Sequence, residues 1–226
     1  MFSKKITFNY FDILQEEDAK NMFKMIPHNF PKYFSKIPKN LNIENMSTIL
    51  PFSSTIKTCP GFINLYRRSI LVTSPYDIYI QYNEKGIQYY HVGQINLNRY
   101  GDIVSVHSNA QFIDYINTDK YKFITKITLP VSLNTDISLL MSQSSYHFND
   151  LNILSGVLPS NYKRDLNFFI AVEKNVNVLH IKQGDPLFLM TPLCENKIKL
   201  EFKKFKSMYP HLTFSNLKKF ILEKLI

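Results

Sequence analysis

The sequence predicts a mainly β protein with a jelly-roll type of core, and two observations support this fold class. The segment 155–193 contains three apolar runs separated by two turn signals, which is typical of three consecutive strands. From residue 62 onward, short apolar stretches alternate with turn residues such as Ser74-Pro75 and the Asn-Glu-Lys-Gly run at 83–86. Several short strands at this spacing indicate a sandwich, jelly roll or barrel.

The N-terminal quarter is expected to contain a strand, a short helix and an extended segment. Residues 1–13 alternate apolar and polar side chains, as a half-buried strand does. Residues 15–25 have acids in their first turn and lysines later, which favours a helix that ends before Pro27. The five prolines of the segment 26–60 predict an extended chain that wraps the core.

The middle of the chain is expected to be mainly strand. Five strands are predicted at 62–72, 77–83, 87–92, 103–107 and 122–129. Residues 110–117 are expected to form one or two helical turns across the sheet. The segment 131–154 gives two interpretations, because Leu133, Ile137 and Leu140 fit a helical stripe whereas Leu151 and Ile153 fit a strand.

The last thirty residues differ from the rest in charge. They contain eight lysines against Glu201 and Glu223, and three apolar residues, Leu217, Phe220 and Ile221, fall at helical spacing. We therefore expect a single β-rich domain at 1–196, followed by a basic amphipathic helical arm at 197–226. The residues expected to bind a partner are Lys203, Lys204, Lys206, Leu217, Phe220 and Ile221.

The amino-acid composition indicates the type of genome that encodes this protein more clearly than it indicates the chemistry of a functional site. Ile, Lys, Asn, Phe and Tyr together make up 101 of the 226 residues, and their codons are AT-rich, which favours an AT-rich bacterium, its phage or a comparable virus. The net charge of +9 is compatible with a nucleic-acid partner, but the lysines are scattered singly, so nucleic acid is not the favoured partner.

Neither secretion nor a membrane span is expected. The first twenty residues contain no apolar run followed by small residues, and no stretch approaches 18 apolar residues. Cys59 and Cys194 form no Cys-x-x-Cys pair, so reduced thiols are expected. The expected location is a virion or the host cytoplasm.

One stretch resembles the trimeric dUTPase and dCTP deaminase family. The matching residues are Gly156, Val157, Tyr162 and the Gly184-Asp185 turn, within about forty residues. The resemblance implies a dUTPase-like β-clip core and a nucleotide site near Tyr162 and Asp165, in which Asp150, Asp136 or Asp165 would have to supply the catalytic carboxylate. Pro159 stands where the family has its catalytic aspartate, and proline has no group that can activate water. The resemblance therefore implies the fold and not the activity.

The order of several landmarks is also similar to that of short phage-encoded proteins to which no activity is attached. These landmarks include the Lys-Thr-Cys-Pro-Gly run at 57–61 and Thr191-Pro192. This similarity agrees with the AT-rich composition.

Metal and nucleophile chemistry have weak support in the sequence. His91, His107 and His180 fall on expected strands, but no His-x-Asp pair occurs among the six histidines. Cys59 lies before Pro60-Gly61, and nothing in the sequence links it to a base. We expect no metal and no cofactor.

Together these patterns predict a non-catalytic phage or viral structural or assembly protein that binds neighbouring protein subunits in a homo- or hetero-oligomer. One alternative is a dUTPase-like nucleotide-binding protein or nucleotide hydrolase. A second alternative is a single-stranded nucleic-acid-binding β protein, in which tyrosines of the strands would stack on bases. The tyrosines and arginines considered for that surface are Tyr66, Tyr76, Tyr79, Tyr82, Tyr89, Tyr90, Tyr100, Arg67, Arg68 and Arg99.

Overall fold

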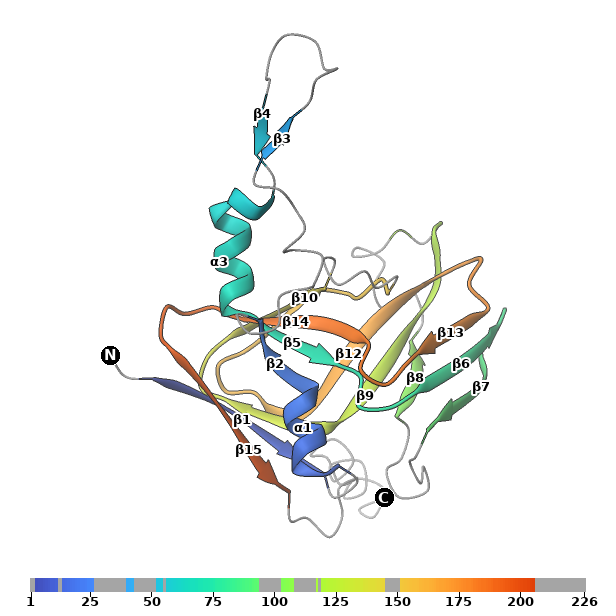
Figure 1. The fold of residues 1–226 in the computed structure, drawn as a ribbon. Coiled ribbons are helices and arrows are strands. Elements are labelled where there is room, and N and C mark those ends of the chain that lie inside the picture. Colours follow the sequence, from blue (N-terminus) through green and yellow to red (C-terminus); the bar gives the residue numbers. More distant parts are fainter. Residues whose placement is uncertain are drawn as a thin grey trace.

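A computed structural model of the chain shows a mainly β protein with several sheets, as the sequence predicts (Figure 1). The structure describes residues 3–11, 14–26, 40–42, 52–54, 56–93, 103–107, 117, 119–144 and 151–205. Its first elements are β1 (Lys4–Tyr10), α1 (Glu16–Met22), β2 (Phe23–Met25), β3 (Asn40–Asn42), β4 (Phe52–Ser54), η2 (Ile56–Thr58), α3 (Pro60–Arg68), β5 (Ile70–Thr73), β6 (Ile78–Asn83) and β7 (Gly86–Val92). Its later elements are β8 (Val104–His107), β9 (Tyr121–Thr135), β10 (Leu139–Gln143), β11 (Gly156–Leu158), β12 (Lys163–Glu173), β13 (Val178–Ile181), β14 (Pro186–Pro192) and β15 (Ile198–Lys204).

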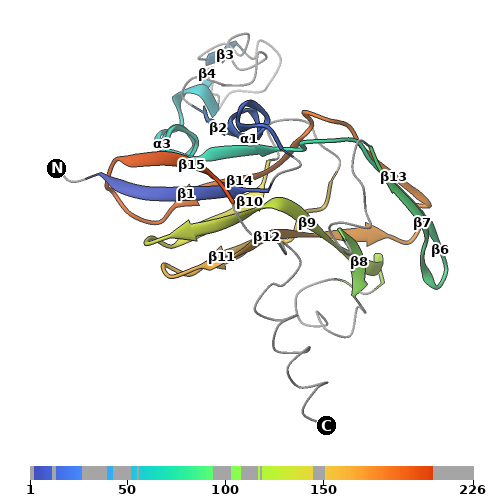
Figure 2. The ribbon, with the colours of Figure 1, turned by 90° about the horizontal axis from the view of Figure 1, so that it is seen from below.

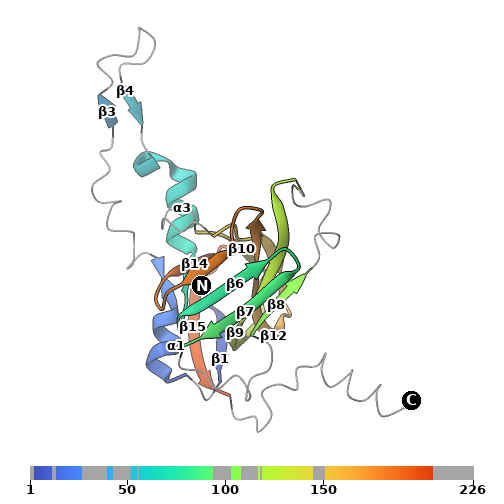
Figure 3. The ribbon, with the colours of Figure 1, turned by 90° about the vertical axis from the view of Figure 1, so that its right-hand side faces the viewer.

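The strands form three main sheets. The first sheet has the order β12-β9-β1-β15, with β8 also paired to β9, and the second has the order β11-β10-β14-β5-β2. The third sheet, β13-β6-β7, lies at one end of the molecule (Figure 2). A separate pair, β3 and β4, lies beyond the first turn of α3, away from these sheets (Figure 3).

The core lies between the first two sheets. Alternate residues of β1 and β9 point inward and are fully buried, among them Phe8 and Leu133. Aromatic rings link the layers: the rings of Phe168 and Phe188 have centroids 5.4 Å apart. The third sheet joins the same core through Tyr82, whose buried hydroxyl lies 2.9 Å from Oγ1 of Thr125.

The segment 155–193 begins with β11, a fourth strand beyond the three expected. The three expected strands are present as β12, β13 and β14. Although they follow one another in the sequence, each belongs to a different sheet: β12 pairs with β9, β13 with β6, and β14 with both β10 and β5. The expected strands at 77–83, 87–92 and 103–107 are likewise present as β6, β7 and β8. The strand expected at 122–129 is β9, which continues to Thr135.

The prediction of a strand at 62–72 is wrong over most of its length, because Pro60–Arg68 is the helix α3. Proline suits the first turn of a helix, since its missing N–H has no partner to lose there. Phe62 and Tyr66, four residues apart, then turn the same helical face to the protein and are buried. Only Ile70–Thr73 is strand.

Two other helical expectations also need correction. The helix expected at 15–25 ends at Met22, because Phe23–Met25 pairs with β5. The helical interpretation of 131–154 is wrong where the structure describes it: Leu133, Leu139 and Met141 are buried at alternating positions of β9 and β10. Among the described residues, no helix has the length and apolarity that crossing a membrane requires.

The segment 197–226 does not begin as a helix. Ile198–Lys204 is the strand β15, and it pairs in parallel with β1 from Lys4↔Ile198 to Tyr10↔Lys204. Phe202 faces the core, with its ring 5.5 Å from that of Phe8. The expectations for 110–117, for most of 26–60 and for the helix around Leu217 lie outside the described residues.

Candidate docking site

The helix α3 lies on the outer face of the second sheet. Its buried residues Phe62 and Tyr66 pack with Leu71 of β5 and Leu189 of β14 in a small second core. The two rings of the helix contact each other, with centroids 4.5 Å apart. The helix therefore packs over β14, the central strand of that sheet, and its neighbour β5.

A pair of buried hydroxyls fixes the end of α3 to β14. Oγ of Ser69 donates to the carbonyl oxygen of Leu65 at 2.7 Å and lies 2.6 Å from Oγ1 of Thr191. Because the single hydroxyl hydrogen of Ser69 is used on Leu65, Thr191 is the donor in the second bond. The separation between helix and strand is thus set by hydrogen bonds as well as by apolar packing.

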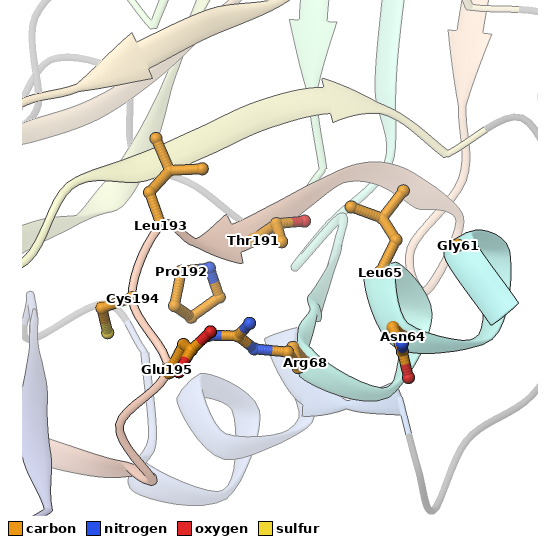
Figure 4. A pocket seen from close by; sticks show the side chains of 9 residues that line it. All are labelled: Gly61, Asn64, Leu65, Arg68, Thr191, Pro192, Leu193, Cys194 and Glu195. Carbon is orange, nitrogen blue, oxygen red and sulfur yellow. The ribbon is translucent and has the colours of Figure 1, made fainter.

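A pocket of about 430 Å³ opens between α3 and the end of β14 (Figure 4). Residues at helical spacing on α3 form one wall, and the chain leaving β14 forms the other. The pocket is lined by Gly61, Asn64, Leu65, Arg68, Thr191, Pro192, Leu193, Cys194 and Glu195. Leu65 is 39% exposed and Leu193 is 54% exposed, so both walls present apolar side chains to solvent.

The apolar surface continues from the pocket across the second sheet. Thr191 of β14 is paired with Leu140 of β10, and Leu140 with Val157 of β11, so the three side chains share one face. Thr191 is buried beneath α3, Leu140 is half-buried, and Val157 is 58% exposed. Leu65, Leu193, Leu140 and Val157 are called the apolar strip below.

This arrangement is suited to binding an apolar surface. Exposed apolar side chains that lie together and are rimmed by polar groups are typical of protein interaction sites. Arg68 and Glu195 supply charged groups of opposite sign at the pocket. Both cysteines are free, with Cys59 exposed at the N-terminal end of α3 and Cys194 half-buried in the pocket wall.

The structure brings Tyr162 and Asp165, two of the expected nucleotide ligands, close together. The hydroxyl of Tyr162 donates to the main-chain oxygen of Asp165 at 2.8 Å. Burial raises the pKa of the Asp165 carboxyl to about 6, and the charge of Lys126 opposes this shift. The Tyr162 hydroxyl therefore already uses its hydrogen on the main chain of the adjacent strand, β12. The third expected ligand, Asp150, lies outside the described residues.

Of the residues expected to bind a partner, Lys203 and Lys204 lie on the edge strand β15, and not on a helical arm. Lys203 forms an ion pair with Glu201 at 3.8 Å. The remaining members, Lys206, Leu217, Phe220 and Ile221, lie outside the described residues.

The stacking surface expected from the tyrosines is wrong for three of them, because Tyr66, Tyr76 and Tyr82 are buried. Tyr79 and Tyr89 do lie on the outer face of the third sheet, on neighbouring strands. In the part of the chain that the structure describes, no three His, Cys, Asp or Glu side chains gather as metal ligands. His91 and His180 flank Tyr79 on the two neighbouring strands.

Comparison with protein-family models, with curated proteins and with solved structures finds no match to this chain. The apolar strip was not found from the sequence. The sequence did contain a signal for the helix that forms one wall of the pocket, because Pro60, Phe62 and Tyr66 together mark an amphipathic helix. The other residues of the strip come from strands far apart in the sequence, and only the sheet brings them together.

Proposed function

We propose that this protein is a non-catalytic structural or assembly component, as in a phage or viral particle, that binds neighbouring protein subunits. The apolar strip beside α3 is the observation that carries the proposal. Three of its members lie on α3, β10 and β11, and the fourth, Leu193, directly follows β14, so the strip is built mainly on regular elements of the fold. Burial of such a surface against a partner is favourable in proportion to its apolar area.

The partner we propose for the strip is a second copy of the chain. A symmetric contact between two copies requires one self-complementary patch, and an apolar surface with Arg68 and Glu195 at its pocket meets this requirement, since each charge can approach the opposite charge of the other copy. The AT-rich composition supports a phage or viral origin.

A more specific fold is part of the proposal. The two sheets packed face to face, and the crossing of the chain between sheets at β12, β13 and β14, support a jelly-roll or dUTPase-like β-clip core. Assembly through such a core would not depend on a C-terminal arm.

The test is light scattering after size exclusion of the intact protein and two matched variants. We expect an oligomer for the unchanged chain, and dissociation for Val157→Lys, because a lysine in the strip places a charge in the contact. Val178→Lys is the control, since Val178 is also an exposed strand valine, 46% accessible, but lies on the third sheet. A monomeric unchanged protein at high concentration, or equal assembly of both variants, would contradict the proposal.

A nucleotide-binding function is the second candidate, because the half-buried carboxyl of Asp165, with its raised pKa, lies beside Tyr162. If this function is correct, dUTP or dCTP raises the melting temperature of the protein, and Tyr162→Ala weakens that effect. No shift with either nucleotide would remove this candidate.

A further inference from the structure

Three lysines converge on a single carboxylate on the outer face of the first sheet. Nζ of Lys5, Lys199 and Lys203 lie 3.1, 3.7 and 3.8 Å from the carboxylate oxygens of Glu201. A hydrogen bond from Lys5, followed by the charges of the three lysines, lowers the pKa of Glu201. Among the described residues, no second carboxylate lies within ion-pair distance of any of the three, so the cluster carries excess positive charge.

The register of β1 and β15 concentrates this charge. Lys5 and Lys199 are direct partners in the parallel pair, and like charges placed opposite each other destabilise a sheet. Lysines on an edge strand protect it from pairing with other chains, which explains Lys199 and Lys203 on β15. It does not explain Lys5, because β1 is an inner strand between β9 and β15.

The surroundings of the cluster are polar and rich in hydrogen-bonding groups. One row across the sheet contains Glu201, Thr7, Asn134 and Lys163, which are paired in turn on β15, β1, β9 and β12. The next row contains Lys203, Asn9, Ser132 and Asp165, paired in turn on the same four strands; the carboxyl of Asp165 is half-buried, and the charge of Lys126 acts on it. Lysine, asparagine, serine and threonine side chains all contact phosphate oxygens in complexes with nucleic acids.

We propose that this lysine face, Lys5, Lys199 and Lys203 with the polar rows beside them, binds the phosphate backbone of nucleic acid without reading its sequence. A polyanion supplies the negative charge that Glu201 alone does not, and the whole chain carries +9. The face belongs to the first sheet, whereas the apolar strip belongs to the second, so the two sites are separate.

The test measures fluorescence anisotropy of a labelled DNA duplex of mixed sequence at increasing sodium chloride concentrations. The first variant combines Lys5→Gln, Lys199→Gln and Lys203→Gln. The control combines Lys85→Gln, Lys174→Gln and Lys182→Gln, which are exposed lysines that form no ion pair with a described residue. Both variants lower the net charge by the same amount, so they separate a local site from an effect of total charge.

We expect the unchanged protein to bind, and the first variant to lose roughly tenfold or more in affinity at low salt. The slope of log affinity against log salt should fall by about 3 for that variant, and the control should keep most of its affinity and slope. Glu201→Gln should bind more tightly than the unchanged protein, because it removes the competing carboxylate; its melting temperature serves as the check on folding.

Three results would overturn the proposal. One is the absence of binding by the unchanged protein at low salt. Another is an equal loss in both triple variants, which would show an effect of net charge alone. The third is displacement of the DNA by polyglutamate at the same charge concentration, which would indicate an acidic protein as the partner of this face.

Discussion

Ser69 and Thr191 share a buried hydrogen bond of 2.6 Å between their hydroxyl oxygens, although 122 residues separate them in the sequence. Ser69 directly follows the last residue of the helix α3, and Thr191 is the last residue but one of β14. The bond therefore joins the two walls of the pocket and holds the apolar strip in one geometry.

The direction of that hydrogen bond predicts unequal effects of two substitutions. Ser69→Ala leaves the buried Thr191 hydroxyl without an acceptor and should lower the free energy of unfolding by about 2 kcal/mol. Thr191→Val removes the donor to the Ser69 hydroxyl, but the hydrogen of Ser69 still bonds to Leu65. A smaller loss in the free energy of unfolding, about 1 kcal/mol, is therefore expected. Urea denaturation measures both values, and a greater loss for the Thr191 variant would contradict the assigned direction.

The role of β15 as a strand of the core predicts a stability effect within the segment 197–226. Phe202→Ala removes a ring that contacts Phe8 and Phe23, and should lower the free energy of unfolding by about 2 kcal/mol. Lys204→Ala, an exposed position on the same strand, is the control. If the segment were an arm free of the core, urea denaturation would show no difference between the two variants.

The raised pKa of Asp165 predicts a specific pH dependence. A carboxyl with a folded-state pKa of about 6, against an ordinary value of 3.8, holds its proton more tightly in the folded protein. Its contribution to stability is therefore fully present below about pH 4 and is lost as the pH rises through 6. Asparagine resembles the protonated form, so Asp165→Asn should gain stability relative to the unchanged protein over this window.

The expected gain is about 1 kcal/mol at pH 7, after allowance for the partial exposure of the carboxyl. Urea denaturation of both proteins between pH 4 and pH 7 measures it. Other titrating groups are common to both proteins and cancel in the difference. A difference that stays constant across this range would show that Asp165 keeps its ordinary pKa.

The contact between the third and first sheets predicts a buried hydrogen-bond effect. Thr125→Val leaves the Tyr82 hydroxyl without its partner and should lower the free energy of unfolding by about 1 to 2 kcal/mol. Burial raises the pKa of Tyr82 to about 12, and the hydrogen bond from Thr125 opposes that shift. Urea denaturation measures this loss in the free energy of unfolding, and an unchanged value would contradict the assigned contact.

The amino-acid sequence by itself determined the β class and most of the local strands. Alternation of apolar and polar residues is a local signal, and it located β1. Short apolar stretches bounded by turn residues located β6, β7 and β8. Glycine marked two turns for a local reason as well: Gly86 and Gly184 have φ of 139° and 85°, which side chains rarely adopt. Such features depend on a few neighbouring residues and need no knowledge of the fold.

Only the tertiary structure decided which surfaces are covered. The parallel pairing of β15 with β1 joins residues almost two hundred positions apart, and it turned the start of an expected arm into core. Likewise, Val157 is exposed and Thr191 is buried on one face, because α3 packs over β14 and not over β11. The spacing of apolar residues within a segment indicates which of its faces is buried. It does not indicate which distant strand or helix covers that face, because pairing and coverage result from contacts between segments far apart in the sequence.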